Sequence, residues 1–218
     1  MSGLIRYSID GVFFSDYSIR VSKSSGLIDP LKQKDRFSRS FQDSPGIYTD
    51  TRKSTVGERV IELECFVVAD TPADLHSKLS AVTGLFQKSG YLRLMVEIGN
   101  IKPLVYDVYC SNLTPYKFKW KSGRNVATFT VTLVDPMPTK RVYMFKLTEN
   151  KHVDLEFLSN IAARIYWGDG KYNDCLKGGI MHEYEEFGEY YVAICGDFDL
   201  LYFIIESVDF FELIWSLQ

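Results

Sequence analysis

Two stretches of the sequence alternate strictly between apolar and polar side chains, and this alternation constrains the fold more than any other feature. In residues 59–67, RVIELECFV, apolar side chains occupy every second position from 61 to 67, and Glu62 and Glu64 fall between them. Residues 126–134, VATFTVTLV, alternate in the same way. Successive side chains of a β-strand point to opposite faces of its sheet, so each stretch predicts a strand with one buried face. The chain is therefore expected to be mainly β.

Shorter apolar runs predict further strands before and after these two. Leu4 to Val12 contains the dipeptide Asp10-Gly11, which favours a tight hairpin turn. The other predicted strands are residues 91–98, 105–110, 141–147, 164–167, 190–195 and 202–205. Glycine and aspartate pairs separate the strands of the second half, as is typical of a small all-β unit.

One helix is predicted within this β pattern. Thr71 is a suitable N-cap, Pro72 suits the first helical position, and Asp74 is an acid three residues after the cap. Gly90 is expected to end the helix. Apolar residues recur between these points at spacings of three or four, namely Leu75, Leu79, Val82 and Phe86. Because that stripe must be buried against a sheet, the first half of the chain is expected to be an α+β domain.

The segment Asp135-Pro136-Met137-Pro138 marks the expected boundary between two domains, residues 1–138 and 139–218. Proline cannot continue a strand ladder, because it lacks the backbone N–H. The charge changes sign at the same place: residues 1–138 have 18 basic and 14 acidic side chains, whereas residues 139–218 have 7 and 14. Neither half is charged strongly enough to indicate nucleic-acid binding.

Residues 22–57 form a long polar stretch with no strong strand or helix pattern. Such stretches are uncommon inside compact domains and usually have a function or are disordered. Spaced aromatic residues favour an extended arm that becomes ordered when a neighbouring subunit covers it, although a mobile loop would fit the same composition. On the first interpretation the interface residues are Phe37, Phe41 and Tyr48 as apolar anchors, with Arg36, Arg39 and Arg52 as the polar rim.

The sequence contains no pattern typical of an enzyme site. His76, His152 and His182 lack a second ligand residue at zinc-site spacing. A nucleophile elbow, a phosphate-binding loop and a dinucleotide fingerprint are all missing. We therefore predict no catalytic residue and no cofactor.

Clustered acidic residues are expected to be structural or solvated. Four glutamates are predicted to form a solvated face: Glu183, Glu185, Glu186 and Glu189. A second group of oxygen-bearing residues does not follow the spacing of a calcium loop: Asp169, Asn173, Asp174, Asp197 and Asp199. We expect these side chains to bond backbone amides in tight turns, and we predict no metal site.

The N-terminus has no pattern of a secretory signal, and the apolar runs near the C-terminus are too short for a membrane helix. The chain is therefore expected to be soluble and made in a cytoplasm. The cysteines are Cys65, Cys110, Cys175 and Cys195. Reduced, buried thiols are expected, although Cys175 and Cys195 could approach each other and form a disulfide.

Residues 1–138 resemble the N-terminal domain of phage distal tail proteins. The matching features are the opening strand pair, the polar arm, RVIELECFVVAD, the helix TPADLHSKLSAVTGLFQKSG, YLRLMVEI and the closing ATFTVTLVDPMP. The resemblance implies a tail-tube-like β-sandwich or barrel with one packed helix. It also implies assembly into a homo-oligomeric ring, a hexamer in that family, that joins the tail tube to the adhesion apparatus.

Residues 139–218 resemble a PKD-like module. Trp167-Gly168-Asp169-Gly170 matches its WGDG motif, and the continuation is matched by His182, Tyr184, Gly188, Tyr190 and Val192. The resemblance implies a small all-β sandwich in which Trp167 anchors the core and Asp169 caps the glycine turn. The residues from 198 to 218 are long and apolar by comparison, and we expect their strand edge to pair with another chain.

Together the two resemblances imply a non-enzymatic structural protein of the virion tail tip, made in the host bacterial cytoplasm. Its partners would be copies of itself and other tail or baseplate proteins, without nucleic acid or membrane insertion. A cell-surface glycan is a further expected ligand, stacking on Tyr172, Tyr184 or Tyr191. The alternative is a bacterial surface or secreted glycan-binding or protein-binding module with no phage role, and an unrecognised hydrolase is a third option.

Overall fold

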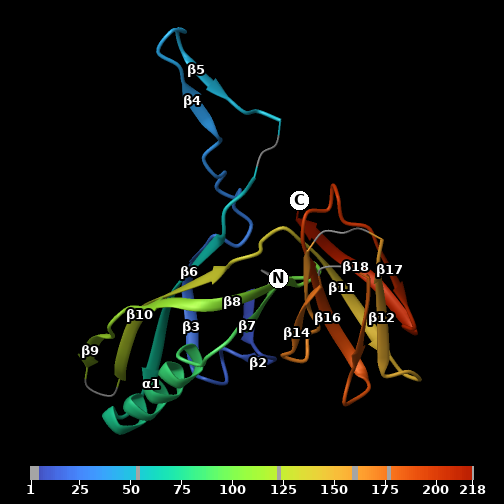
Figure 1. The fold of residues 1–218 in the computed structure, drawn as a ribbon. Helices are drawn as coiled ribbons and strands as arrows, with labels where there is room; N and C mark the ends of the chain where they lie inside the picture. The colour runs from blue at the N-terminus through green and yellow to red at the C-terminus, as the bar shows by residue number, and fades with distance from the viewer. Residues whose placement is uncertain (1–4, 53–54, 122–123, 159–161, 176–177, 218) are drawn as a thin grey trace.

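The structure, a computed structural model, describes residues 5–52, 55–121, 124–158, 162–175 and 178–217. It is mostly β, with several sheets and one helix, as the alternation predicts. Figure 1 shows three parts: an N-terminal sheet with α1 on one face, a C-terminal pair of sheets beside it, and a hairpin that projects away from both.

The N-terminal sheet has eight strands in the order β2-β1-β7-β8-β10-β6-β3, with β9 also paired to β10. The strands are β1 (Ile5–Ile9), β2 (Val12–Phe13), β3 (Ile19–Ser25), β6 (Arg59–Ala69), β7 (Leu92–Ile98), β8 (Leu104–Leu113), β9 (Lys117–Lys121) and β10 (Arg124–Asp135). The two alternating stretches are β6 and β10, which pair antiparallel along their whole length. The predicted face of β6 is buried, which confirms that prediction. The opening hairpin is also confirmed, and Leu4 lies outside the described residues.

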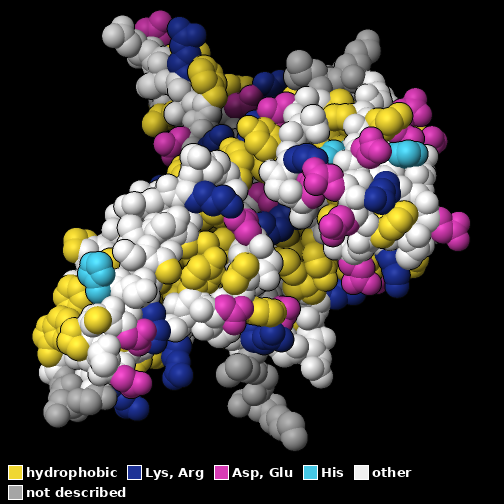
Figure 2. Space-filling view, turned by 90° about the horizontal axis from the view of Figure 1, so that it is seen from below, with side chains coloured by type: hydrophobic (Ala, Val, Ile, Leu, Met, Phe, Trp, Pro, Cys, Tyr) yellow, Lys and Arg dark blue, Asp and Glu magenta, His cyan; other side chains and the backbone are white. Residues whose placement is uncertain are grey.

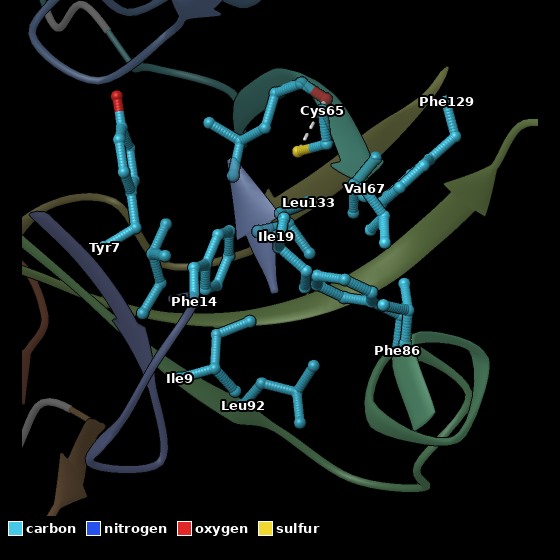
Figure 3. Close-up of a cluster of buried hydrophobic side chains, with 14 of the residues drawn as sticks. Tyr7, Ile9, Phe14, Ile19, Cys65, Val67, Phe86, Leu92, Phe129 and Leu133 are labelled. Carbon is cyan, nitrogen blue, oxygen red and sulfur yellow. Dashed lines mark hydrogen bonds between the residues drawn. The ribbon is translucent and has the colours of Figure 1, made fainter. Parts of the chain in front are cut away.

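The predicted helix is α1 (Pro72–Phe86). The Thr71 side chain accepts a hydrogen bond from the Asp74 amide at 3.1 Å, and the buried residues are the four of the predicted stripe. The helix ends before Gly90, which instead takes a left-handed backbone (φ 93°) in the turn to β7. In Figure 3, Phe86 of α1 packs into the same core as Phe14, Ile19 and Leu92, which lie on the sheet or the loops beside it.

The C-terminal part has two sheets, β14-β13-β16-β11-β18 and β15-β12-β17. Their strands are β11 (Lys140–Leu147), β12 (His152–Phe157), β13 (Ala163–Tyr166), β14 (Tyr172–Cys175), β15 (Gly178–Glu183), β16 (Gly188–Cys195), β17 (Phe203–Glu206) and β18 (Phe210–Leu217). Residues from both sheets, including Phe145 and Leu155, enclose a core around Trp167. No described strand up to Asp135 pairs with one from Lys140 onward.

The apolar C-terminal residues form the edges of both C-terminal sheets. β18 pairs antiparallel with β11 of the same chain on one side, and the expected pairing of its other edge with another chain stays a prediction. Trp215 of β18 also contacts Tyr106 of β8, with ring centroids 5.8 Å apart. β18 is therefore the edge strand of the five-stranded C-terminal sheet, with one side hydrogen-bonded to β11.

Candidate assembly surfaces

The arm, residues 26–57, is rooted firmly in the N-terminal sheet. The buried guanidinium of Arg59 donates hydrogen bonds to the carbonyl oxygens of Gly26 (2.5 Å), Leu27 (3.0 Å) and Asp29 (3.1 Å). The Tyr106 hydroxyl donates to the Leu27 carbonyl at 2.6 Å. Gly26 has a φ of +83°, and a Cβ there would lie 1.9 Å from the Val60 carbonyl oxygen, so only glycine fits. The direction in which the arm leaves the sheet is therefore fixed by its root.

The tip of the arm is a hairpin of β4 (Ser38–Ser40) and β5 (Ile47–Thr49) that stands clear of the rest of the protein (Figure 1). Phe37 is 70% exposed and Tyr48 is 61% exposed, and Phe41 and Ile47 are also exposed. Burial of apolar side chains drives folding, so a pre-shaped hairpin with four exposed ones is typical of a surface that a partner covers.

The arm brings its predicted arginines close to its aromatic residues. The Arg39 guanidinium lies 5.1 Å from the centroid of the Phe41 ring, and β4–β5 pairing sets Arg39 opposite Tyr48. Arg52 pairs with Asp50 at 2.6 Å, and this hydrogen bond holds the pKa of Asp50 below its ordinary value. Arg36 is exposed beside them. All six predicted interface residues thus lie on one projecting element, and their role in an interface stays a prediction.

The residues of the WGDG motif and its continuation form one cluster. Trp167 is fully buried and stacks on His182, with ring centroids 4.4 Å apart and planes 6° apart. His182 Nε2 lies 2.9 Å from Asp169 Oδ2. The Tyr184 hydroxyl donates to the Trp167 carbonyl at 2.9 Å, and the Tyr184 ring contacts that of Tyr190 at 4.1 Å. These contacts are those of a core, and they join the loop after β13 to β15 and β16.

Asp169 organises the glycine turn electrostatically. Burial alone would raise the pKa of its carboxyl group, but hydrogen bonds from His182 and from the Lys171 amide outweigh burial and lower it. Both glycines of the motif take left-handed backbones, Gly168 at φ +93° and Gly170 at φ +88°. Gly188 begins β16 and leads into Tyr190. The likeness of residues 139–218 to a PKD-like module stays a prediction.

A cleft of about 690 Å³ lies between the N-terminal and C-terminal parts. Tyr91, Tyr166 and Tyr172 contact one another at its wall, with ring centroids 5.4–5.8 Å apart. Tyr172 is 49% exposed, and Tyr191, half-buried, also lines the cleft. Tyr184 is only 1% exposed, so its ring cannot stack on a ligand, and the expectation for that residue is wrong.

A hydrogen bond and an ion pair help to join the two parts. Arg93 of β7 pairs with Asp107 of β8 at 2.6 Å and also donates a hydrogen bond to the Tyr191 carbonyl of β16. Lys140 and Asp135 form a fully buried pair at 2.7 Å across the proline-containing connection. Burial alone would lower the pKa of Lys140, but the carboxylates of Asp135 and Asp107 raise it, so this lysine stays charged.

Three of the predicted oxygen-bearing residues make structural contacts, namely Asp169, Asn173 and Asp174. Asn173 Oδ1 accepts a 2.7 Å hydrogen bond from the Trp167 indole, and Asp174 pairs with Arg164. Across the described ranges, no group of three or more His, Cys, Asp or Glu side chains is arranged to hold a metal ion. His76 and His152 are exposed and lie on α1 and β12, which Figure 1 shows far apart. The helix within the described part of the chain is too short to cross a membrane.

The four cysteines carry free thiols. Burial raises the pKa of Cys65 and of Cys195 to about 12, so both thiols stay protonated and unreactive at neutral pH. Cys175 is buried and Cys110 half-buried. None of them is therefore a candidate nucleophile.

Sequence reasoning missed one exposed surface, the strand β9. Its sequence, KFKWK, alternates between lysine and aromatic residues, and that pattern was the available signal. Figure 2 shows hydrophobic side chains gathered over the end of the molecule that carries α1 and β9. Phe118 and Trp120 are among the exposed large apolar residues of the protein.

No protein family model matches the chain, and no curated protein sequence matches it. Solved structures do. The Dit protein of phage SPP1, described as a paradigm of the hub adsorption apparatus in phages that infect Gram-positive bacteria, is 12% identical with a TM-score of 0.50. That alignment covers 93% of this chain and 98% of the SPP1 chain.

Chains of the phage p2 baseplate in its activated conformation are also similar, with Sr (TM-score 0.47) and with Ca (TM-score 0.49). Each is 10% identical and aligns over 99% of this chain and 96% of its own. The SPP1 alignment spans both the N-terminal sheet and the C-terminal pair of sheets. The chain therefore has the fold of a phage distal tail protein.

Proposed function

We propose that this protein is a structural subunit of a phage tail tip, a distal tail protein that forms a ring between the tail tube and the adhesion apparatus. The observation that supports this best is the fold, which aligns with that of SPP1 Dit over 93% of the chain. In this proposal the protein is made in the host bacterial cytoplasm, has no enzymatic role, and contacts other tail and baseplate proteins.

Ring assembly is supported by the arm. Its root is fixed by Arg59 and Tyr106, so its direction is set before any partner binds. Its tip holds four exposed apolar side chains that its own chain does not cover. Burying them against a neighbouring copy removes apolar area from water. This burial stabilises the contact by about 25 cal/mol per Å² of apolar area. A root set in one copy and a tip covered by the next is a heterologous contact, which closes into a ring such as a hexamer.

In this arrangement Phe37, Phe41 and Tyr48 are the anchors of the arm contact, and Arg36, Arg39 and Arg52 surround them. The test is the mass of the purified full chain by light scattering. Alanine at the three aromatic positions is expected to shift the ring to monomer, because the anchors supply most of the buried apolar area.

A matched control carries alanine at three comparably exposed apolar positions outside the arm: Ile101, Leu158 and Met181. This variant is expected to keep the mass of the wild-type ring. An unchanged mass in the arm variant would contradict the arm contact. A wild-type chain that stays monomeric at high concentration would contradict ring formation itself.

Glycan binding at the cleft is a second candidate function, favoured by the exposed face of Tyr172 at a cleft of about 690 Å³. This volume is that of an ordinary small-ligand site. Isothermal titration with host cell-wall oligosaccharides is expected to give binding that Tyr172→Ala abolishes. Tyr202→Ala, at an exposed tyrosine that does not line the cleft, is expected to preserve it. If titration of the wild-type protein gives no heat of binding, this candidate function is wrong.

A further inference from the structure

The strand β9 presents an aromatic surface that the described part of the chain leaves uncovered. Phe118 and Trp120 stack on each other, with ring centroids 5.3 Å apart and planes 10° apart, yet they are 47% and 58% exposed. In the β9–β10 register they lie opposite Ala127 and Asn125. Ala127 belongs to the buried core, so the two rings continue the apolar inner face of the sheet beyond the residues that the core covers.

The same segment is basic and has no nearby acid in the sequence. Residues 108–134 contain three lysines and one arginine, with no aspartate or glutamate: Lys117, Lys119, Lys121 and Arg124. Lys117 and Lys119 are exposed on the face opposite the aromatic rings, and neither forms an ion pair with any residue that the structure describes. The lysine side chains are long enough to bend around the edge of β9 that pairs with no described strand, so the aromatic pair fits an apolar partner whose acidic border the lysines reach.

The C-terminal edge, residues 199–213, has these complementary properties. β17 and β18 are edge strands of the two C-terminal sheets, and each has one side without a partner among the described strands. Tyr143 contacts both Phe203 (5.9 Å) and Phe211 (6.2 Å), so the two edges lie on the same side of the sandwich. The exposed apolar residues here are Leu200, Tyr202, Ile204, Phe210, Phe211 and Leu213.

This edge is acidic where β9 is basic. Residues 196–218 contain five acids and no lysine, arginine or histidine: Asp197, Asp199, Glu206, Asp209 and Glu212. Asp199 and Glu206 are exposed beside the apolar side chains. Open strand edges with exposed apolar residues are an aggregation risk unless a specific partner covers them.

Within one copy the two surfaces cannot meet, because Figure 1 shows β9 at one end of the molecule and β17 and β18 at the other. We infer that β9 of one copy docks on the C-terminal edge of the next copy. The stacked pair Phe118–Trp120 lies against the apolar residues of β17 and β18, and Lys117 and Lys119 bend around the unpaired edge of β9 to reach Asp199 and Glu206. The inference rests on the proposed ring and adds a contact between N-terminal and C-terminal parts that is separate from the arm.

A charge-swap experiment on the full chain tests this contact by native mass spectrometry. The β9 variant combines Lys117→Glu with Lys119→Glu, and the edge variant combines Asp199→Lys with Glu206→Lys. Each variant alone is expected to raise the dissociation constant of the ring by about tenfold or more, because like charges then face each other. An equimolar mixture of the two variants is expected to assemble into an even-membered ring in which they alternate, because each substituted β9 then meets a substituted edge and each wild-type β9 meets a wild-type edge. One chain carrying all four substitutions is likewise expected to regain the wild-type mass.

A matched control for the β9 variant, Arg20→Glu with Lys23→Glu, changes the net charge by the same amount on the exposed side of β3 and is expected to keep the ring. Every substituted side chain is exposed, so all variants are expected to fold. Circular dichroism checks this. The β9 contact is wrong, although the ring stands, if the β9 variant and the edge variant keep the wild-type mass. It is also wrong if the chain with all four substitutions stays dissociated. A monomeric wild-type chain overturns the ring, and the contact with it.

Discussion

Gly168 lies directly against the backbone of Tyr191: a Cβ added at Gly168 would sit 2.8 Å from the Tyr191 carbonyl oxygen. The same carbonyl accepts a hydrogen bond from Arg93 of the N-terminal sheet. The glycine turn therefore leaves room for the Arg93 contact that joins the two parts of the chain.

Gly168→Ala is expected to lower the free energy of unfolding by about 3 kcal/mol, from a left-handed backbone and a steric clash together. Gly170→Ala is the matched control, because Gly170 has a similar φ of +88° but open space around it. We expect the control to cost about 1–2 kcal/mol, the backbone contribution alone. Urea denaturation measures both, and equal losses would show that the close approach to Tyr191 is unimportant.

Asp107→Asn is expected to destabilise the protein by about 3–5 kcal/mol, because it leaves the Arg93 guanidinium buried without its counter-charge. The Arg93 and Asp107 side chains are 12% and 4% exposed, so solvent screens this pair little. The double variant Arg93→Met with Asp107→Leu is expected to lose less than Asp107→Asn alone, since no unpaired charge remains. Denaturation midpoints provide the comparison, and a loss below about 1 kcal/mol in Asp107→Asn would contradict the buried-pair argument.

Arg59→Met is expected to loosen the arm without unfolding the sheet. The substitution removes the donor to the carbonyl oxygens at the arm root, a loss of about 1–3 kcal/mol. Hydrogen exchange is expected to become faster in residues 26–34 and to remain unchanged in α1. Arg20→Met, an exposed arginine on the neighbouring strand β3, is the control. Unchanged exchange at the root would mean that Arg59 does not hold the arm.

Acid is expected to destabilise the C-terminal part. The pKa of Asp174 is lowered by its hydrogen bond to Arg164, and that of Asp209 by hydrogen bonds from the Glu149 and Thr148 amides. Because the folded pKa lies below the ordinary 3.8, each carboxylate stabilises the fold above that pH. This stability is lost as the pH falls from about 3.8 through the folded pKa.

The thermal midpoint, followed by circular dichroism, is therefore expected to be flat near neutral pH and to fall below about pH 4. Asp209→Asn is expected to lower the midpoint at neutral pH and to reduce this dependence. A variant with the same acid slope as the wild type would exclude Asp209 as a source of the slope.

The sequence by itself determined the elements whose signals are local. The alternation of β6 follows from the opposite directions of neighbouring side chains, and the start and buried stripe of α1 follow from Thr71 and from residues three or four apart. Such signals need only the residues of one element. The polar strand β3 was missed because it contains no clear apolar period, and β9 was missed because its alternation covers only five residues.

Only the tertiary structure decided which distant residues meet and which stay exposed. Trp167 and His182 stack because β15 folds back beside the glycine turn, and Arg59 reaches the arm root because β3 pairs with β6. Likewise, Tyr184 is an aromatic residue of the type that stacks on ligands, but it is buried. The Phe118–Trp120 pair, in contrast, extends beyond the core. Burial depends on packing between segments far apart in the chain, and no local pattern of residues contains that information.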